Sequence, residues 1–215
     1  MLAYVDRVTE QATRRPLSRE VVLDAALRLG DEKGLEAVSM RGVAKELGVE
    51  AMSLYNHVSN KAAMITGMLE RVLAGIEIPD AGLEWGARLR ALATAMHSAF
   101  TAHPVAATMI VTGAAPRGFA ALRPIEELYA ILYGAGFSDE IASRGVTAVT
   151  GLVFGTAMLA PARGQDAEER TWFRQNVTAE RFPNLHRALR AETPDAAADF
   201  GHQVDLVVEG LRARQ

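Results

Sequence analysis

The chain has 215 residues, of which 49% are hydrophobic, and a formal net charge of −3. This length and hydrophobic content suffice for a sizeable core, which excludes disordered and collagen-like chains. The chain has no cysteine, which excludes disulfide frameworks, thiolate zinc sites and cysteine nucleophiles, so we expect a protein of the reducing cytoplasm. Residues 1–16 contain three arginines but no apolar segment, and we expect a polar arm there rather than a secretory signal.

Three helix starts follow one another in the first sixty residues. Ser18, Ser39 and Asn60 are residue types that cap helix N-termini, and each precedes an apolar repeat of helical period. Gly34 and Gly48 stand where the first two helices have to stop, because glycine readily takes the left-handed conformation of a helix end. The sequence therefore predicts a helix from Ser18 to Gly34, a second from Ser39 to Gly48, and a connector helix beginning at Asn60.

Residues 39–61 have the pattern of a helix-turn-helix, which places one short helix in the major groove of DNA. After the turn at Gly48, Leu54 and Val58 share the inner face of the third helix at positions i and i+4. The remaining side chains form the predicted reading surface: Ala51, Met52, Ser53, Tyr55, Asn56 and His57. A helical hairpin that packs without touching DNA is the alternative.

Charge alone does not identify a nucleic-acid binder. Residues 1–61 carry nine Lys and Arg and nine Asp and Glu, so attraction to phosphates is weak for an unaided monomer. The basic residues are nevertheless placed before the first helix and beside the reading helix: Arg14, Arg15 and Arg19, then Arg41, Lys45 and Lys61. We expect a local basic face on a neutral head.

The rest of the chain predicts helices and no strand. Breaker residues at 78–82 separate the connector from helices expected at 83–102, 104–112, 118–133, 138–159, 167–177, 183–191 and 194–214. The expected fold is all-α: a three-helix helix-turn-helix head, a connector helix and a larger helical body. We set the domains at residues 18–63 and 64–215.

Residues 145–162 carry no charge, which raises the question of a membrane helix. A spanning helix needs about 20 predominantly apolar residues, and threonines and glycines dilute this run, so we expect a helix in a core or a subunit interface. Gly151 and Gly155 lie one turn apart and allow close helix approach. The predicted dimer interface is Val149, Gly151, Leu152, Gly155 and Leu159, with Phe200, Val204, Val207, Val208 and Leu211 of the last helix. The core of a monomer is the alternative.

Residues 21–68 resemble the TetR family of transcriptional repressors. The resemblance is carried by Ala25-Ala26-Leu27, Ser39-Met40-Arg41, Leu47-Gly48-Val49, Leu54-Tyr55-Asn56-His57-Val58 and Asn60-Lys61. The run from Ser53 to Lys61 and the turn Gly136-Phe137-Ser138 are most similar to the tetracycline-repressor-like branch.

The resemblance implies a homodimer that binds a palindromic double-stranded DNA operator and a small-molecule effector. By position, Arg41, Ala51, Met52, Ser53 and Asn56 would face base edges. Ser39, Tyr55, His57 and Lys61 would mostly hold phosphates. Dimerisation would use a four-helix interface built from the uncharged helix and the last helix of each subunit.

The resemblance also implies that an effector pocket in the body swings the connector helix. The candidates are the larger side chains of the body: Trp85, Met96, His97, Phe100, His103, Met109, Phe119, Tyr129, Tyr133, Phe154 and Met158. Any of them can instead be core, since aromatic and methionine stripes usually pack. Relatives that bind magnesium-tetracycline have a His before a Gly-Thr-Arg-Pro-like loop, which this chain replaces by residues 111–116, so tetracycline itself is in question.

We predict neither a cofactor nor a metal site. His97 and His103 are close in sequence but not at the i, i+4 spacing of a chelating pair, and no carboxylate stands at ligand spacing. The sequence contains no nucleophile elbow, Walker loop or His-Glu-x-x-His motif, so we expect no enzyme. A helical scaffold without DNA binding and a transcriptional activator are the alternative functions.

Overall fold

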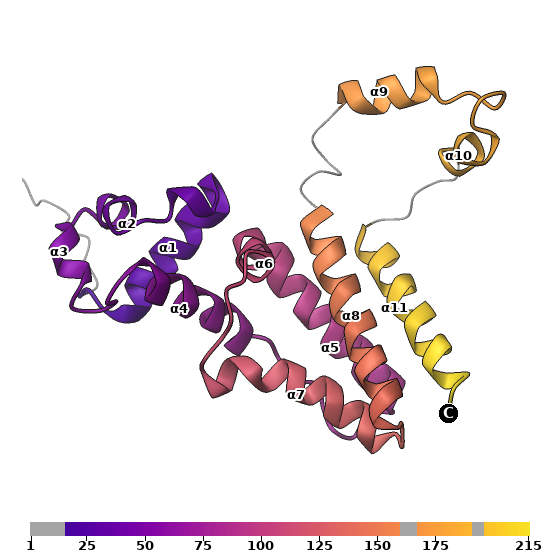
Figure 1. Ribbon diagram of the computed structural model, residues 1–215, viewed down its shortest axis with the longest axis horizontal. Helices are drawn as coiled ribbons and strands as arrows, with labels where there is room; N and C mark the ends of the chain where they lie inside the picture. Colours follow the sequence, from indigo (N-terminus) through magenta and orange to yellow (C-terminus); the bar gives the residue numbers. More distant parts are fainter. Residues whose placement is uncertain (1–15, 160–166, 191–195) are drawn as a thin grey trace, which may run out of the picture.

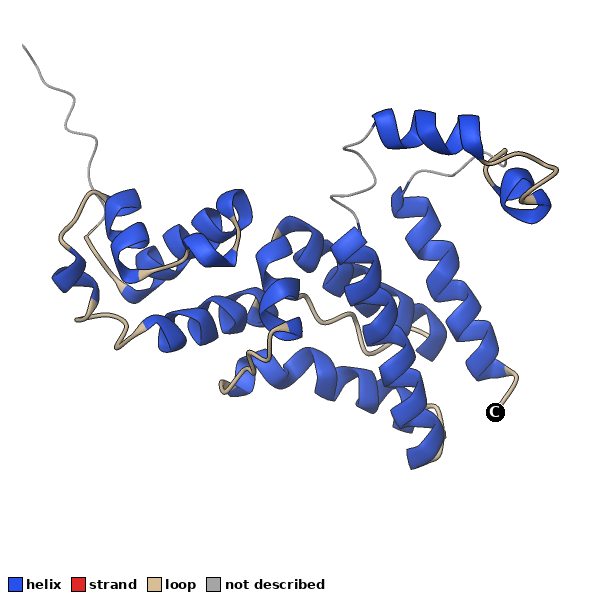
Figure 2. Cartoon of the chain, turned by 45° about the horizontal axis from the view of Figure 1, so that its top comes forward, coloured by secondary structure: helices blue, strands red, loops and turns tan. Residues whose placement is uncertain are grey.

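The computed structural model describes residues 16–159, 167–190 and 196–215. Every regular element in these ranges is a helix, and Figure 2 shows no strand among them. The prediction of an all-α chain with a head, a connector and a body is thereby confirmed. The expected N-terminal arm, with Arg14 and Arg15, lies outside the described residues apart from Pro16.

The head consists of α1 (Arg19–Lys33), the short 3₁₀ helix η1 (Leu35–Ala37), α2 (Met40–Leu47) and α3 (Ala51–Leu54). The predicted caps are present: the Ser18 hydroxyl accepts a hydrogen bond from the Val21 amide, and Gly34 ends α1 with φ +80°. The apolar stripes of α1 and α2 meet in a small core. Four of its side chains are completely buried: Val22, Ala26, Val43 and Leu54.

The connector is α4 (Lys61–Ala74), capped by the Asn60 side chain, which accepts from the Ala63 amide at 2.8 Å. Its buried face, Met64, Met68 and Leu69, joins the core of the head to that of the body. The expected division at residues 63 and 64 falls inside this unbroken helix. Figure 1 shows α4 running from the head to the body.

The body contains α5 (Trp85–Ala102), α6 (Pro104–Val111), α7 (Phe119–Gly134), α8 (Asp139–Leu159), α9 (Ala167–Asn176), α10 (Pro183–Ala188) and α11 (Ala196–Arg212). All seven match their predicted ranges to within a turn, as helix ends usually allow. Helices α5, α7, α8 and α11 pack side by side, whereas α9 and α10 stand away from that bundle (Figures 1 and 2).

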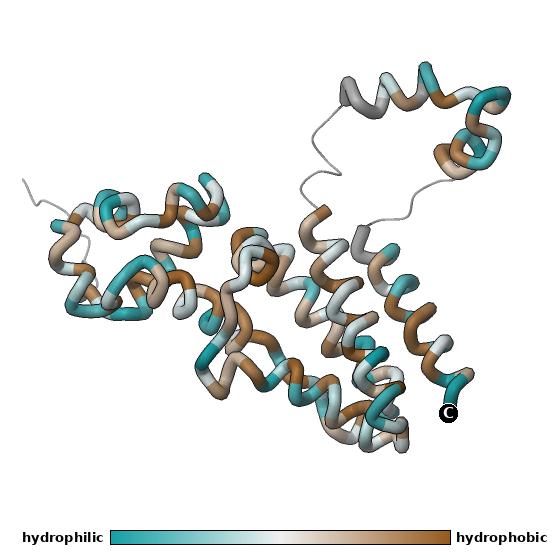
Figure 3. The backbone as a smooth tube through the Cα atoms, in the orientation of Figure 1, coloured by the Kyte–Doolittle hydropathy of each residue, from teal (hydrophilic) through white to brown (hydrophobic). Residues whose placement is uncertain are grey.

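The uncharged helix, α8, is long and apolar enough to cross a membrane by length and composition. In the structure it packs against α5, α6, α7 and α11. Val146, Val149 and Val153 are buried on its inner face, and Figure 3 shows hydrophobic residues recurring along both α8 and α11. The helix therefore has the packing of a body helix with one face left open.

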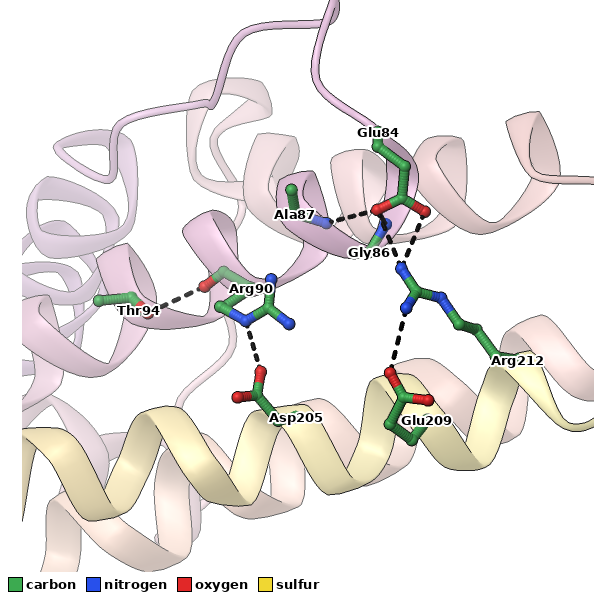
Figure 4. A network of polar contacts seen from close by, with 8 residues as sticks. All are labelled: Glu84, Gly86, Ala87, Arg90, Thr94, Asp205, Glu209 and Arg212. Carbon is green, nitrogen blue, oxygen red and sulfur yellow. Dashed lines mark hydrogen bonds and ion pairs between the residues drawn. The ribbon is translucent and has the colours of Figure 1, made fainter.

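Polar contacts fasten α5 to α11 at the end of the body farthest from the head. The Glu84 carboxylate caps α5 by accepting from the Gly86 amide at 3.0 Å and the Ala87 amide at 3.1 Å, and it also pairs with Arg212 of α11 (Figure 4). Arg90 of α5 pairs with Asp205 of α11. These contacts keep the two helices in register.

The Glu84 cap predicts a pH-dependent stability. The bonds from the Gly86 amide, joined by those from Ala87 and Arg212, hold the pKa of Glu84 below its ordinary value of 4.5. Because the folded pKa is lowered, the stabilisation is present above the unfolded pKa and lost as pH falls through the folded pKa. We expect Glu84→Gln to lower the melting temperature at pH 7, with a deficit that shrinks below pH 4.5. Glu77→Gln, at an exposed site, is the control, and a deficit that persists in acid would contradict the assignment.

Candidate DNA-binding surface and the helical body

The turn between α2 and α3 is fixed by backbone geometry. Gly48 has φ +64° and ψ +40°, and its amide donates to the Lys45 carbonyl while the Val49 amide donates to the Ala44 carbonyl. This pair of bonds is a Schellman motif, in which glycine relieves the strain of the left-handed position. At the other end of α2, the Ser39 hydroxyl accepts from the Gly42 amide at 3.0 Å. Both predicted ends of α2 are confirmed.

The third helix is shorter than the sequence pattern predicts. Helix α3 ends at Leu54, but the His57 and Val58 amides both donate to the Leu54 carbonyl at 2.9 Å, so the chain continues as a tight turn. Leu54 and Val58 are 0% and 3% exposed, as expected of the inner face. Tyr55 and Asn56 consequently lie outside, beyond the end of the helix.

The predicted reading surface is open to solvent and lies at the end of the molecule farthest from α8 and α11 (Figure 1). Met52 is 75% exposed and Tyr55 is 47% exposed. Asn56, Arg41 and Lys61 are also exposed, while Ser39, Ala51, Ser53 and His57 are half-buried. All nine side chains thus retain polar or apolar surface that another molecule can contact.

The basic side chains beside this surface are free to contact DNA phosphates. Arg41, Lys45 and Lys61 are exposed, and none of them forms an ion pair with another residue in the described part of the chain. Lys61 is also the first residue of α4, whose N-terminus adds a favourable dipole for an anion. The local basic face that the sequence predicts is therefore not neutralised internally.

The eleven effector candidates differ widely in burial. Met96, Phe100 and Met109 are at most 1% exposed and belong to the body core, where Phe154 meets Phe100 edge-on with ring centroids 4.8 Å apart. Phe119 lies at the opposite extreme, 93% exposed.

The other candidates each have separate neighbours in the structure. Trp85 packs edge-on against Phe137, His97 stacks on Phe200, and Tyr129 stacks on Tyr133. Tyr133 and Met158 are both nearly half exposed. His103 pairs with Asp31 of the head. A cavity of about 910 Å³ lies between α1, α4 and the end of α5, and His103 is the single candidate of the eleven that lines it.

A charged pair inside the body was missed by sequence reasoning. Arg88 of α5 and Glu127 of α7 form an ion pair, and their side chains are only 20% and 15% exposed. The Arg88 Nε is buried with no hydrogen-bond partner among the described residues. The sequence signal for this pair is a charged residue on the inward side of each helix. The two residues are 39 positions apart, so the sequence alone does not show that they pair.

Five of the ten residues predicted for the dimer interface are buried within the single chain. Val149, Phe200, Val204, Val208 and Leu211 are at most 6% exposed, because α5, α8 and α11 cover them within one chain. In the single chain they pack as core residues and leave little of their surface exposed.

The other half of the predicted interface lies on the open side of the bundle. Leu152 and Val207 are half-buried, whereas Gly151, Gly155 and Leu159 are exposed. A Cβ added at either glycine would meet nothing within 4 Å. Leu206 of α11, which the sequence prediction did not include, is 76% exposed.

Comparison with known proteins gives a consistent family. Residues 22–68 match the model for bacterial regulatory proteins of the tetR family, and residues 78–215 match the tetracyclin repressor-like C-terminal domain. The chain is 30% identical over 209 residues to the class A tetracycline repressor protein from transposon 1721 of Escherichia coli, covering 93% of this chain and 92% of that protein.

Two relatives come from Streptomyces. The transcriptional repressor DrrR1 of Streptomyces coeruleorubidus is 33% identical over 160 residues, which are 72% of this chain but only 57% of that protein. The TetR family protein ActR of Streptomyces coelicolor, solved with (S)-DNPA, superposes with a TM-score of 0.76 at 27% identity, over 94% of this chain and 100% of ActR. A second ActR structure contains actinorhodin. With its helix-turn-helix head and its body both matched, the chain belongs to the TetR family of bacterial transcriptional regulators.

Proposed function

We propose that the chain is a repressor that binds a palindromic operator as a homodimer and leaves it when a small-molecule effector binds the body. The exposed surface of α3 and its turn carries this proposal, because Met52, Tyr55 and Asn56 are solvent-exposed on a head whose caps fix their position. The relatives named above are repressors and regulators. We further infer that the chain acts in the cytoplasm, beside the bacterial chromosome, and catalyses no reaction.

The division of labour on DNA follows from side-chain chemistry. Arg41 can form two hydrogen bonds to the O6 and N7 of guanine, and Ala51 and Met52 can contact a thymine methyl group. Ser53 and Asn56 supply short hydrogen-bonding groups for base edges. The phosphates would be bound by Ser39, Tyr55, His57 and Lys61. The Ser39 hydroxyl can donate its proton to a phosphate while its oxygen accepts the capping bond of α2.

The operator test uses DNA that flanks the coding region of the protein. We expect purified protein to shift a palindromic duplex from that region, and the affinity to fall steeply as salt is raised, because phosphate contacts release counterions. The same duplex with both half-sites scrambled is the control. Equal binding to both duplexes, or none to either, would favour the helical scaffold. A reporter placed behind the palindrome separates repression from activation.

The dimer interface that we propose is the open side of α8 and α11. Gly151 and Gly155 permit close approach of a partner helix, and Leu152, Leu159 and Val207 supply apolar area. We add Leu206, the most exposed leucine of this face. Two such helices from each subunit would form a four-helix interface.

Leu206→Glu tests this face. Burying a leucine is worth about 1.5–3 kcal/mol, and two-fold symmetry counts it twice, so we expect the dimer dissociation constant to rise by about a hundredfold or more. Sedimentation equilibrium over a dilution series gives that constant. Leu122→Glu on α7, at another exposed leucine, should leave it unchanged. Dimers of equal strength in both variants would place the interface elsewhere.

For the effector we propose an organic molecule held within the body, with Arg88 as a polar anchor. ActR has been solved with actinorhodin and with (S)-DNPA, and other relatives are named for tetracycline. A half-buried guanidinium whose buried Nε donor is unused suits an acidic or carbonyl group of such a ligand. Thermal stabilisation by actinorhodin, compared with tetracycline plus magnesium, is the first measurement to make.

A further inference from the structure

Asp31, in the last turn of α1, joins the head to the body. Its Oδ2 lies 2.8 Å from the Nδ1 of His103, and its Oδ1 accepts a hydrogen bond from the Val105 amide at 3.1 Å. These partners stand at the junction of α5 and α6, more than 70 residues along the chain. The Asp31 side chain is 19% exposed, so water competes little for either oxygen.

The contact supplies a cap that α6 otherwise lacks. His103 occupies the N-cap position of α6 without a side-chain hydrogen bond of its own to that helix, and Pro104 has no amide proton to offer. Val105 therefore carries the first amide that can be capped, and a carboxylate is favoured there by the helix dipole. A residue of the head thus completes a helix of the body.

Close packing beside Asp31 restricts how the two helices can move. Gly30 is buried against α6, and a Cβ at that position would lie only 2.8 Å from the Cγ2 of Val105. The missing side chain lets α1 approach α6 within reach of the Asp31 carboxylate. Gly30 and Asp31 together form what we call the α1–α6 joint.

The connector α4 makes a second contact with the segment that begins at α6, at the end of that segment just before α7. The Glu70 carboxylate of α4 accepts from the Arg117 amide at 3.0 Å, just before α7, and a Cβ added at Gly118 would lie 3.3 Å from it. Residues 104–118 are therefore held by a carboxylate at each end, one from α1 and one from α4. A shift of this segment must move both helices or break one of the bonds.

We propose that Asp31 is a positioning residue that sets the angle of the DNA-binding head through α6, so that effector-driven movement reaches the head through α1 as well as through the connector. The role deepens the effector-controlled regulation proposed above and rests on it. When α6 shifts, α1 follows, and the two reading surfaces of a dimer lose the spacing that successive major grooves require.

The joint can be tested without knowing the effector. Because the chain has no cysteine, Glu36→Cys in the head and Ala130→Cys on α7, both exposed, give a unique pair of spin labels. The labelled chain is mixed with excess unlabelled chain, so that only distances within one subunit are measured. We expect a narrow distribution in the parent, a clearly broader or shifted one with Asp31→Ala, and no change with Glu32→Ala, the neighbouring exposed acid.

Superposable distributions for all three proteins would overturn the proposal. A merely structural role would lower the melting temperature without broadening the distance, so both are recorded. If Asp31→Ala is poorly folded, His103→Ala removes one of the two bonds from the side of the body and should broaden the distribution less. An unchanged distribution in that variant would equally overturn the proposal.

A DNA measurement adds a functional arm. A duplex selected by the parent protein from a random pool is compared with a copy that has one extra base pair between its half-sites. The preference is the ratio of the affinities for the two duplexes. We expect Asp31→Ala to lower this ratio about tenfold, which corresponds to the loss of one charged hydrogen bond, and Glu32→Ala to leave it unchanged. Full retention of that preference by Asp31→Ala contradicts the joint. If the parent selects no DNA, the proposed function fails, and the distances still decide the joint.

Discussion

Arg41→Ala is expected to weaken operator binding by about 1–3 kcal/mol for each half-site and to relax the base preference at one position of that half-site. The side chain is exposed in the first turn of α2 and has no ion-pair partner in the described part of the chain, so its removal should not disturb the fold. A bidentate guanine contact combines charge with geometry, which is why both affinity and sequence preference should fall. Because a symmetric dimer contacts two half-sites, the loss in binding free energy applies twice.

Binding is measured against a set of duplexes that differ at single positions of the half-site. Lys33→Ala, at an exposed cation at the end of α1, controls for the loss of charge alone. We expect that control to lower affinity slightly and equally for every duplex. If Arg41→Ala behaves in the same way, with its ranking of bases unchanged, Arg41 holds a phosphate and reads no base.

Local signals account for what the sequence predicted well. Ser18, Ser39 and Asn60 cap their helices through bonds to amides three residues ahead, and Gly48 ends α2 through bonds inside one turn. Such bonds depend on neighbouring residues, so a short stretch of sequence contains all the information they need. The extent of α3 was the exception, because Leu54 and Val58 face inward whether the chain between them is a helix or a turn.

Contacts between distant segments account for what the sequence did not predict. An apolar repeat shows that one face of a helix is buried, but it does not say whether the same chain or a partner covers that face. Val204 and Val208 turned inward, while Leu206 between them turned out. The Asp31 and His103 pair and the Arg88 and Glu127 pair join residues 72 and 39 positions apart, which no local pattern connects.

Removing one member of the half-buried pair between Arg88 and Glu127 should be costly. Glu127→Ala leaves the Arg88 guanidinium at 20% exposure without its counter-charge, and we expect a loss of about 3–5 kcal/mol in the free energy of unfolding. The double variant Arg88→Met with Glu127→Leu removes both charges and fills similar volume, so we expect it to recover most of that loss. Urea unfolding of the two single variants and the double variant gives the comparison.

The same set of variants separates stability from ligand binding. A buried ion pair generally adds little to stability compared with an apolar pair of the same size, so a pair between α5 and α7 with one donor unused fits a binding role better than a structural one. The double variant should therefore be stable yet lose the thermal stabilisation that an effector gives the parent. Stabilisation equal to that of the parent would show that Arg88 and Glu127 only hold α5 against α7.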